Sequence, residues 1–233
     1  IKGEEALLDY LRGHQLEIML VLSSICALLA FFACITKSIS RKKRAGLLLT
    51  ELSAAIMLWA DRLAYIYRGN TSDFGWFMVR FSNFTVFFFT LFIIFSFNIY
   101  LEDLFVSNGK EKNVPKRLYA VSILVALGIL VLIISQFTGW YYFFDETNHY
   151  QRGPLFIVCY IVPLVSLFIQ LSSIFDLYYQ LSRSIRLSLL FFTTIPIIAS
   201  IVQIFVYGIS LTNISIVGTA VLLYIFALID INN

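Results

Sequence analysis

Charged residues are scarce in this chain. Asp, Glu, Lys and Arg make up 13% of its 233 residues, about half of what globular proteins carry. Apolar residues make up 60% and gather in blocks of about 20, the length at which a helix crosses the core of a bilayer. These blocks are continuous runs without alternation, which argues against a β-barrel and favours helices, whose backbone groups are satisfied inside lipid. The sequence therefore predicts an integral membrane protein, with the lipid bilayer as its first partner.

Residues of the kind that build catalytic and metal sites are also few. His14 and His149 are the only histidines, and they lie in different segments. Cys26, Cys34 and Cys159 lie in apolar runs and match no disulfide or metal-ligand spacing. No Ser/His/Asp arrangement and no glycine-rich phosphate loop is present. The chain is thus predicted to be non-catalytic, to hold no metal or other cofactor, and to bind no nucleic acid.

Sequence features of two familiar membrane classes are missing as well. No lysine follows Lys116, so the last span has no residue that can form a Schiff base with retinal. There is no inverted repeat and no pair of broken half-helices of the kind typical of secondary transporters. A rhodopsin is therefore excluded, and a transporter becomes an alternative rather than the first interpretation.

Seven apolar runs predict one all-α domain, residues 1–233, built as a seven-helix membrane bundle. The predicted spans are about 16–35, 45–66, 77–99, 118–137, 155–177, 187–209 and 214–230. The loops after the first, third and fifth spans hold eleven of the 17 basic residues: Lys37, Arg41, Lys42, Lys43, Arg44, Lys110, Lys112, Lys116, Arg117, Arg183 and Arg186. Basic loops stay in the cytoplasm. The N-terminus is therefore predicted outside and the C-terminus inside, in the cell membrane.

Charged side chains interrupt the second and third spans. An ionisable group at the centre of a span costs roughly 2.5–3.5 kcal/mol, so such groups usually face protein and have partners. The two spans are joined by a short turn and are expected to be neighbours. A helix rises about 1.5 Å per residue, which places Asp61 and Arg80 at overlapping distances from the outer ends of their spans. An ion pair between them is therefore expected. Arg62 points about 100° away from Asp61 on the same helix.

Polar residues in the outer part of the bundle suggest a ligand-binding cavity bounded by the second, third, fourth and sixth spans. Its candidate lining residues are Asp61, Arg80, Asn83, Gln136, Gln203 and Tyr207. The expected ligand is small and comes from the outer side. The alternative is a static clamp, in which the same groups only hold neighbouring helices together. The sequence leaves both interpretations open.

The longest outer loop is GWYYFFDETNHYQRGP, residues 139–154. Two aromatic runs flank the sequence Asp145-Glu146-Thr147-Asn148, and Asp and Asn favour turns because their side chains bond to nearby backbone. The loop is therefore predicted to be a small β-hairpin or a cap over the outer mouth. It can serve as a lid, or it can lie in the membrane interface.

Several stretches of the chain resemble a known family. YRGNTSDFGWFMVRFSNF (67–84), followed by a Phe-rich span, is similar to the N-terminal seven-helix membrane region of Firmicutes diguanylate cyclases and some sensor histidine kinases. FTGWYYFFDETNHYQRGP (137–154), QIFVYGISLTNI (203–214) and LIDINN at the end resemble the same region. The resemblance implies a non-catalytic sensor whose seventh helix leads to a cytoplasmic output domain. Arg62 departs from the family pattern, in which a small residue follows the aspartate.

The leading hypothesis is thus a sensory input domain that works as a homodimer. On this view the chain is a piece of a longer protein, and a cytoplasmic effector follows Asn233. A small-solute transporter or channel is the alternative, and it predicts polar residues that continue through the midplane. Glu51, Asn98 and Gln170 fit that alternative. A membrane scaffold with a closed core is a third hypothesis, and it predicts no cavity.

Overall fold

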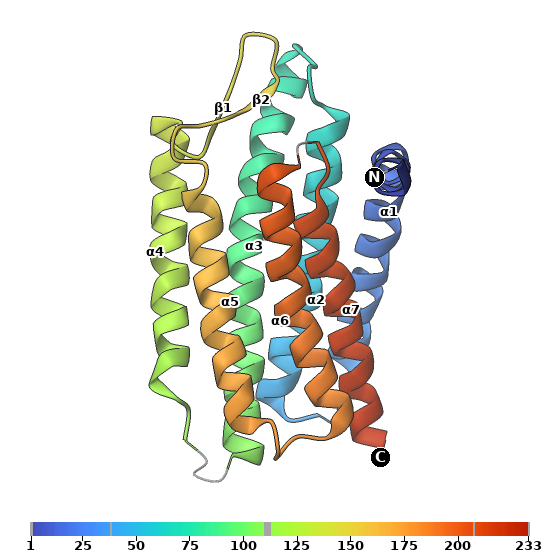
Figure 1. Ribbon diagram of the computed structural model, residues 1–233, viewed down its shortest axis with the longest axis vertical. Helices are drawn as coiled ribbons and strands as arrows, with labels where there is room; N and C mark the ends of the chain where they lie inside the picture. The colour runs from blue at the N-terminus through green and yellow to red at the C-terminus, as the bar shows by residue number, and fades with distance from the viewer. Residues whose placement is uncertain (1, 38, 110–112, 207, 233) are drawn as a thin grey trace.

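The computed structural model describes residues 2–37, 39–109, 113–206 and 208–232. In these residues seven α-helices form an elongated bundle with a two-stranded β-hairpin at one end (Figure 1). The elements are α1 (Lys2–Ile35), α2 (Arg41–Ile66), α3 (Asp73–Asn108), α4 (Lys116–Thr138), β1 (Tyr142–Phe144), β2 (Tyr150–Arg152), α5 (Val158–Leu177), α6 (Arg183–Phe205) and α7 (Leu211–Asn232). The prediction of an all-α membrane bundle with a small hairpin is confirmed.

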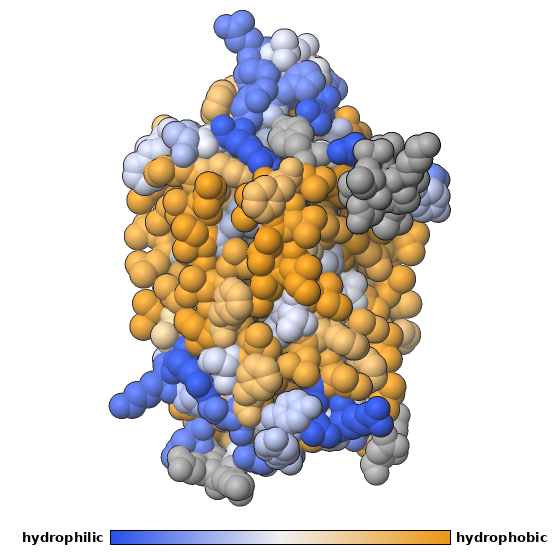
Figure 2. Space-filling model, in the orientation of Figure 1, coloured by the Kyte–Doolittle hydropathy of each residue, from blue (hydrophilic) through white to orange (hydrophobic). Residues whose placement is uncertain are grey.

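Six of the helices in the described part of the chain are long and apolar enough to cross a membrane. They are α1 from Tyr10 onward and α3 to α7. α2 differs because four basic residues, 41–44, open it and Glu51, Asp61 and Arg62 lie within it. It nevertheless packs in the bundle against α1 and α3. Figure 2 shows hydrophobic side chains in a broad band around the middle of the molecule and hydrophilic ones at both ends. The chain is a multi-pass membrane protein.

The helices follow one another around the bundle, and α7 closes it against α1, α2 and α6. α3 packs against α2, α4 and α5. Gly46 allows α2 to approach it closely, because a Cβ at that position would lie 2.8 Å from the backbone N of Tyr100. Large buried aromatic side chains fill the half of the core away from the hairpin. The rings of Phe97 and Phe192 lie 4.2 Å apart there, and both side chains are almost fully buried.

The β-hairpin projects from the end of the bundle where α2 turns into α3 and where α6 turns into α7 (Figure 1). Its strands are antiparallel, with Tyr142 opposite Arg152 and Phe144 opposite Tyr150. We call this end of the bundle, which includes residues 67–72 and 139–157, the hairpin end. The loops that join α1 to α2 and α5 to α6 lie at the other end, together with the end of α7.

Asp145 organises the turn of the hairpin. Its Oδ1 accepts hydrogen bonds from the backbone N–H of His149 at 2.9 Å and of Thr147 at 3.0 Å, and its Oδ2 accepts one from Gln151 Nε2 at 2.9 Å. The bond from His149, followed by those from Gln151 and Thr147, holds the pKa of Asp145 well below its usual range. The prediction of a turn at residues 145–148 inside a small hairpin is confirmed.

Candidate functional site

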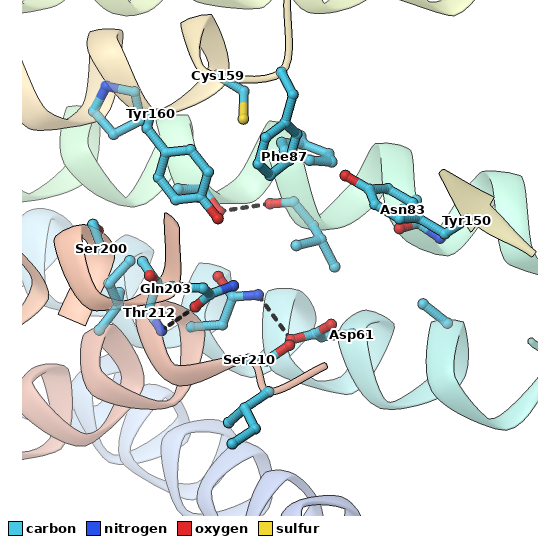
Figure 3. Close-up of a pocket in the computed structure, with 18 of the residues that line it drawn as sticks. Asp61, Asn83, Phe87, Tyr150, Cys159, Tyr160, Ser200, Gln203, Ser210 and Thr212 are labelled. Atoms are coloured by element: carbon cyan, nitrogen blue, oxygen red, sulfur yellow. Dashed lines mark hydrogen bonds between the residues drawn. The ribbon is translucent and has the colours of Figure 1, made fainter. Parts of the chain in front are cut away.

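A cavity of about 170 Å³ lies in the bundle under the hairpin. Its walls come from α2, α3, α5, α6 and α7 and from the loop between α6 and α7, and β2 contributes to its roof (Figure 3). The lining is mainly apolar and aromatic, with polar groups at a few points. The aromatic side chains are Tyr65, Phe87, Tyr150, Phe156 and Tyr160. This arrangement of an apolar hollow with a small number of polar groups is typical of small-molecule sites.

Asp61 is the acidic group of the cavity. Its side chain is 6% exposed, and its Oδ2 accepts a 2.7 Å hydrogen bond from Asn213 Nδ2 in the first turn of α7. The Ser210 hydroxyl lies beside the same carboxylate and donates to the hydroxyl of Tyr65 at 3.4 Å. Helices α2 and α7 are therefore joined at the cavity through an acid and two neutral polar groups.

The expected ion pair between Asp61 and Arg80 is wrong. Arg80 does not line the cavity. Its guanidinium lies over the ring of Trp76 at 3.8 Å and over that of Phe144 at 4.6 Å, and its Nη1 donates to Asn148 Oδ1 at 2.8 Å. The depth argument considered only the position along the helix axis. The cavity face of α3 carries residues 79, 83, 86 and 87, and Arg80 points away from it towards the hairpin.

Asn148 fixes the hairpin to the turn between α2 and α3. It is 3% exposed and has a φ of 59°, a left-handed conformation that Asn tolerates better than most residues. Besides the bond from Arg80, its Nδ2 donates to the carbonyl O of Asn70 at 2.7 Å. Its own carbonyl O accepts from Gly69 N at 3.1 Å. These contacts hold the roof of the cavity in one position.

The other candidate residues divide into two groups. Asn83 and Gln203 line the cavity with Asp61; Asn83 Nδ2 donates to Val79 O at 2.8 Å, and Gln203 Oε1 accepts from Thr212 N at 2.6 Å. Gln136 lies outside the cavity on α4, where its Oε1 accepts from the hydroxyl of Tyr142 at 3.0 Å. Tyr207 lies outside the described residues. The predicted boundary by spans two, three, four and six is thus corrected, because α5 and α7 line the cavity and α4 does not.

Arg152 and Asn213 are cavity residues that were not among the candidates. Arg152 donates from Nη1 to Ile204 O at 3.2 Å and from Nη2 to Gln203 O at 3.4 Å, and its guanidinium lies 4.3 Å from the ring of Phe156. Arg152 belongs to the loop 139–154, which the sequence predicted to be a hairpin or a cap over the outer mouth. Asn213 stands in an N-x-Ser pattern, but that pattern does not indicate a partner on another helix.

The cavity does not continue through the bundle. The residues that line it farthest from the hairpin are Ile94, Leu167 and Ile216, and the packed rings of Phe97 and Phe192 follow. Among the described residues no group of three His, Cys, Asp or Glu side chains could hold a metal ion. Neither a protein-family model, nor a curated protein, nor a solved structure matches this chain.

Proposed function

We propose that this chain is the membrane-embedded sensory input domain of a signalling protein. A small ligand in the cavity shifts the populations of two states of the bundle. α7 passes the change to a cytoplasmic effector of the diguanylate cyclase or histidine kinase kind that the sequence resemblance implies. The domain works as a homodimer in the cell membrane.

In the proposed topology all seven helices span the bilayer, with the N-terminus outside. α2 is included because its 26 residues are long enough to cross a hydrocarbon core of about 30 Å. The basic residues support this orientation, since residues 41–44 and Arg183 and Arg186 belong to the end opposite the hairpin. Basic segments stay on the cytoplasmic side, so the hairpin end faces outward.

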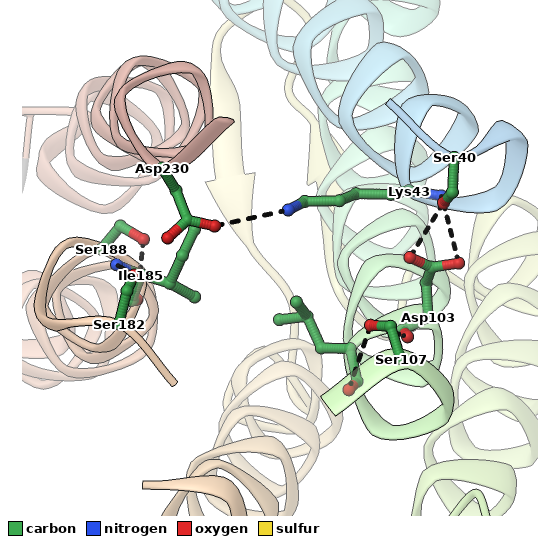
Figure 4. Close-up of polar contacts among 9 residues, drawn as sticks. Ser40, Lys43, Asp103, Ser107, Ser182, Ile185, Ser188 and Asp230 are labelled. Atoms are coloured by element: carbon green, nitrogen blue, oxygen red, sulfur yellow. Dashed lines mark hydrogen bonds and ion pairs between the residues drawn. The ribbon is translucent and has the colours of Figure 1, made fainter. Parts of the chain in front are cut away.

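One observation carries the proposal: α2 and α7 meet through a polar contact at each end of the bundle. At the cavity Asn213 of α7 donates to Asp61 of α2. At the other end Lys43 Nζ of α2 lies 3.9 Å from Asp230 Oδ2 of α7 (Figure 4). A ligand that engages Asp61 competes with Asn213 and therefore acts on the same pair of helices whose other ends meet at Lys43 and Asp230.

The test is to change the cavity and measure the opposite end. Spin labels are attached at Arg41→Cys and Ile229→Cys, two exposed positions, in a chain whose exposed Cys34 is replaced by Ser. Asp61→Asn weakens the contact with Asn213. We expect it to shift the distribution of label distances by a few Å or to change the weights of two peaks.

Gln136→Leu is the matched control, because Gln136 lies at the hairpin end but outside the cavity. It should leave the label distances unchanged. If Asp61→Asn gives the distribution of the unsubstituted chain while the protein stays folded, the cavity is not coupled to the far end and the proposal fails.

A small-solute transporter or channel is the alternative. Glu51, one of the three polar residues that favour it, is buried in α2 and does not line the cavity. The other two bond to protein: Gln170 Nε2 donates to Ile94 O at 3.0 Å and to Asn98 Oδ1 at 3.3 Å, and Asn98 Nδ2 donates to Leu118 O at 2.9 Å. These residues thus have structural partners and do not extend the cavity. Flux of small solutes into liposomes that contain only this chain would favour the alternative.

A further inference from the structure

Asp61 is a buried acid whose hydrogen-bonding partners are neutral. No Lys, Arg or His of the described residues forms an ion pair with it. Arg62, which follows Asp61 in the sequence, donates from Nε to Leu16 O of α1 at 3.1 Å. Arg80, the partner predicted for Asp61, donates to Asn148. A buried charge costs several kcal/mol unless a counter-charge compensates it. Within membrane spans such residues usually mark a functional site.

Aromatic side chains line the same cavity as this acid. Tyr65 comes one helical turn after Asp61 on α2, and its hydroxyl accepts from Ser210. Tyr160 of α5 lies on the opposite wall of the cavity (Figure 3). Phe87 and Phe156 also line the cavity. The faces of aromatic rings attract cations, most strongly where water is excluded.

We propose that the cavity binds a small organic cation, a protonated amine on a short apolar or aromatic body, with Asp61 as its counter-ion. The inference rests on the proposed function, since it names the ligand class of the same cavity. A volume of about 170 Å³ lies below the roughly 300–1,000 Å³ typical of drug-sized ligands. The occupant is therefore small, with the ammonium group at Asp61 and the apolar body against Phe87 and Phe156.

The two arginines that also line the cavity favour this orientation over an anionic ligand. Arg152 already donates to the carbonyl oxygens of Gln203 and Ile204 and lies over Phe156. Arg68 is exposed at the rim of the cavity. The deeply buried charge of the site is therefore the negative one, and it is the charge that a bound ligand can compensate.

The experiment uses three probes of nearly equal size and shape: 2-phenylethylamine, 2-phenylethanol and phenylacetate, which are cationic, neutral and anionic at pH 7. Their binding to the full chain in lipid nanodiscs is measured by calorimetry, and binding to empty nanodiscs is subtracted. We expect the amine to bind at least 10-fold more tightly than the alcohol and the carboxylate to bind weakest.

Two isosteric substitutions on α2 distinguish the loss of the carboxylate in the cavity from the loss of a buried carboxylate elsewhere on the same helix. Asp61→Asn should abolish the preference for the amine over the alcohol, and continued binding of the alcohol shows that the cavity is intact. Glu51→Gln removes another buried carboxylate of the same helix that does not line the cavity. It should keep the preference for the amine.

Equal or tighter binding of the alcohol or the carboxylate, no binding of any probe above the empty nanodiscs, or an amine affinity unchanged by Asp61→Asn would each overturn the inference. The spin-label pair at positions 41 and 229 keeps this failure separate from failure of the proposed function. If phenylacetate binds and changes the label distances, the sensor proposal holds and the cation inference is wrong. If the amine binds through Asp61 and the label distances do not change, the cation inference holds and the sensor proposal is wrong.

Discussion

Arg80 Nη1 donates a 2.8 Å hydrogen bond to Oδ1 of Asn148, 68 residues later in the chain. This bond joins α3 to the turn of the β-hairpin that roofs the cavity. The guanidinium is enclosed by the rings of Trp76 and Phe144, so one side chain contributes a hydrogen bond and two cation–π contacts. Arg80, a charged residue within an apolar run, thus helps to attach the β-hairpin to α3.

Replacing Arg80 by Gln should loosen that attachment. The loss of a charge-assisted bond and of two ring contacts should lower the free energy of local opening by about 2 kcal/mol. Hydrogen exchange of the backbone amides of Gly69 and Asn148 should then accelerate roughly 30-fold. Arg62→Gln is the control, because Arg62 donates to Leu16 O on the other side of α2. Equal exchange rates in both variants would contradict this role of Arg80.

Gly69 should be intolerant of any side chain. Its φ is +76°, and an added Cβ would lie 2.9 Å from Cε1 of His149. The left-handed conformation alone costs an alanine about 1–2 kcal/mol, and the imidazole of His149 must move to make room for the added Cβ. Gly69→Ala should therefore lower the melting temperature of the chain in detergent. Gly218→Ala, in α7 with no atom within 4 Å of the added Cβ, should not lower it; equal losses would argue against the hairpin contact.

Acid should release the turn of the hairpin through Asp145. Hydrogen bonds, that of His149 N–H first, lower the folded-state pKa of Asp145, so the carboxylate stabilises the turn fully above its unfolded pKa of about 3.9. The contribution is lost as the pH falls below that value towards the folded pKa. Exchange protection of the amides of Thr147 and His149, corrected for intrinsic rates, should be constant from pH 8 to about pH 5 and fall at lower pH. Asp145→Asn should show no such acid transition; a transition of the same size would assign it to another group.

The sequence predicted the helices well because membrane spans leave a local signal. The predicted span 118–137 agrees closely with α4, Lys116–Thr138, and 187–209 overlaps α6, Arg183–Phe205. The helix that contains the third predicted span, 77–99, extends beyond it at both ends. Ser72 accepts a hydrogen bond from Gly75 N and starts α3 at Asp73, and the helix continues past the apolar run to Asn108. Hydropathy detects the apolar segment that can cross the bilayer, whereas capping and packing decide where the helix begins and ends.

The site was predicted only in part because it depends on which helix faces which. Asp61, Asn83 and Gln203 were expected at one cavity and do line it. Gln136 was expected there too, but α4 packs on the outside of α3 and α5, an order that hydropathy does not contain. Asn213, the partner of Asp61, was missed because the pairing joins residues 152 positions apart. Depth along each helix can be read from a sequence, but the direction in which a side chain points into the bundle depends on all its neighbours.

Asn98 and Gln170 provide a test of whether the polar residues at mid-depth are structural. The 3.3 Å bond between Gln170 Nε2 and Asn98 Oδ1 joins α5 to α3, and Asn98 also bonds to the backbone of α4. Asn98→Leu and Gln170→Leu should each lower the free energy of unfolding by about 1 kcal/mol, and a double-mutant cycle should give a coupling of about 0.6 kcal/mol, at most about 1.7. Unfolding by SDS in mixed micelles measures these values, with Phe137→Leu, at an exposed position of α4, as the control. Strictly additive losses would mean that the two amides act independently, and the transporter alternative would regain support from them.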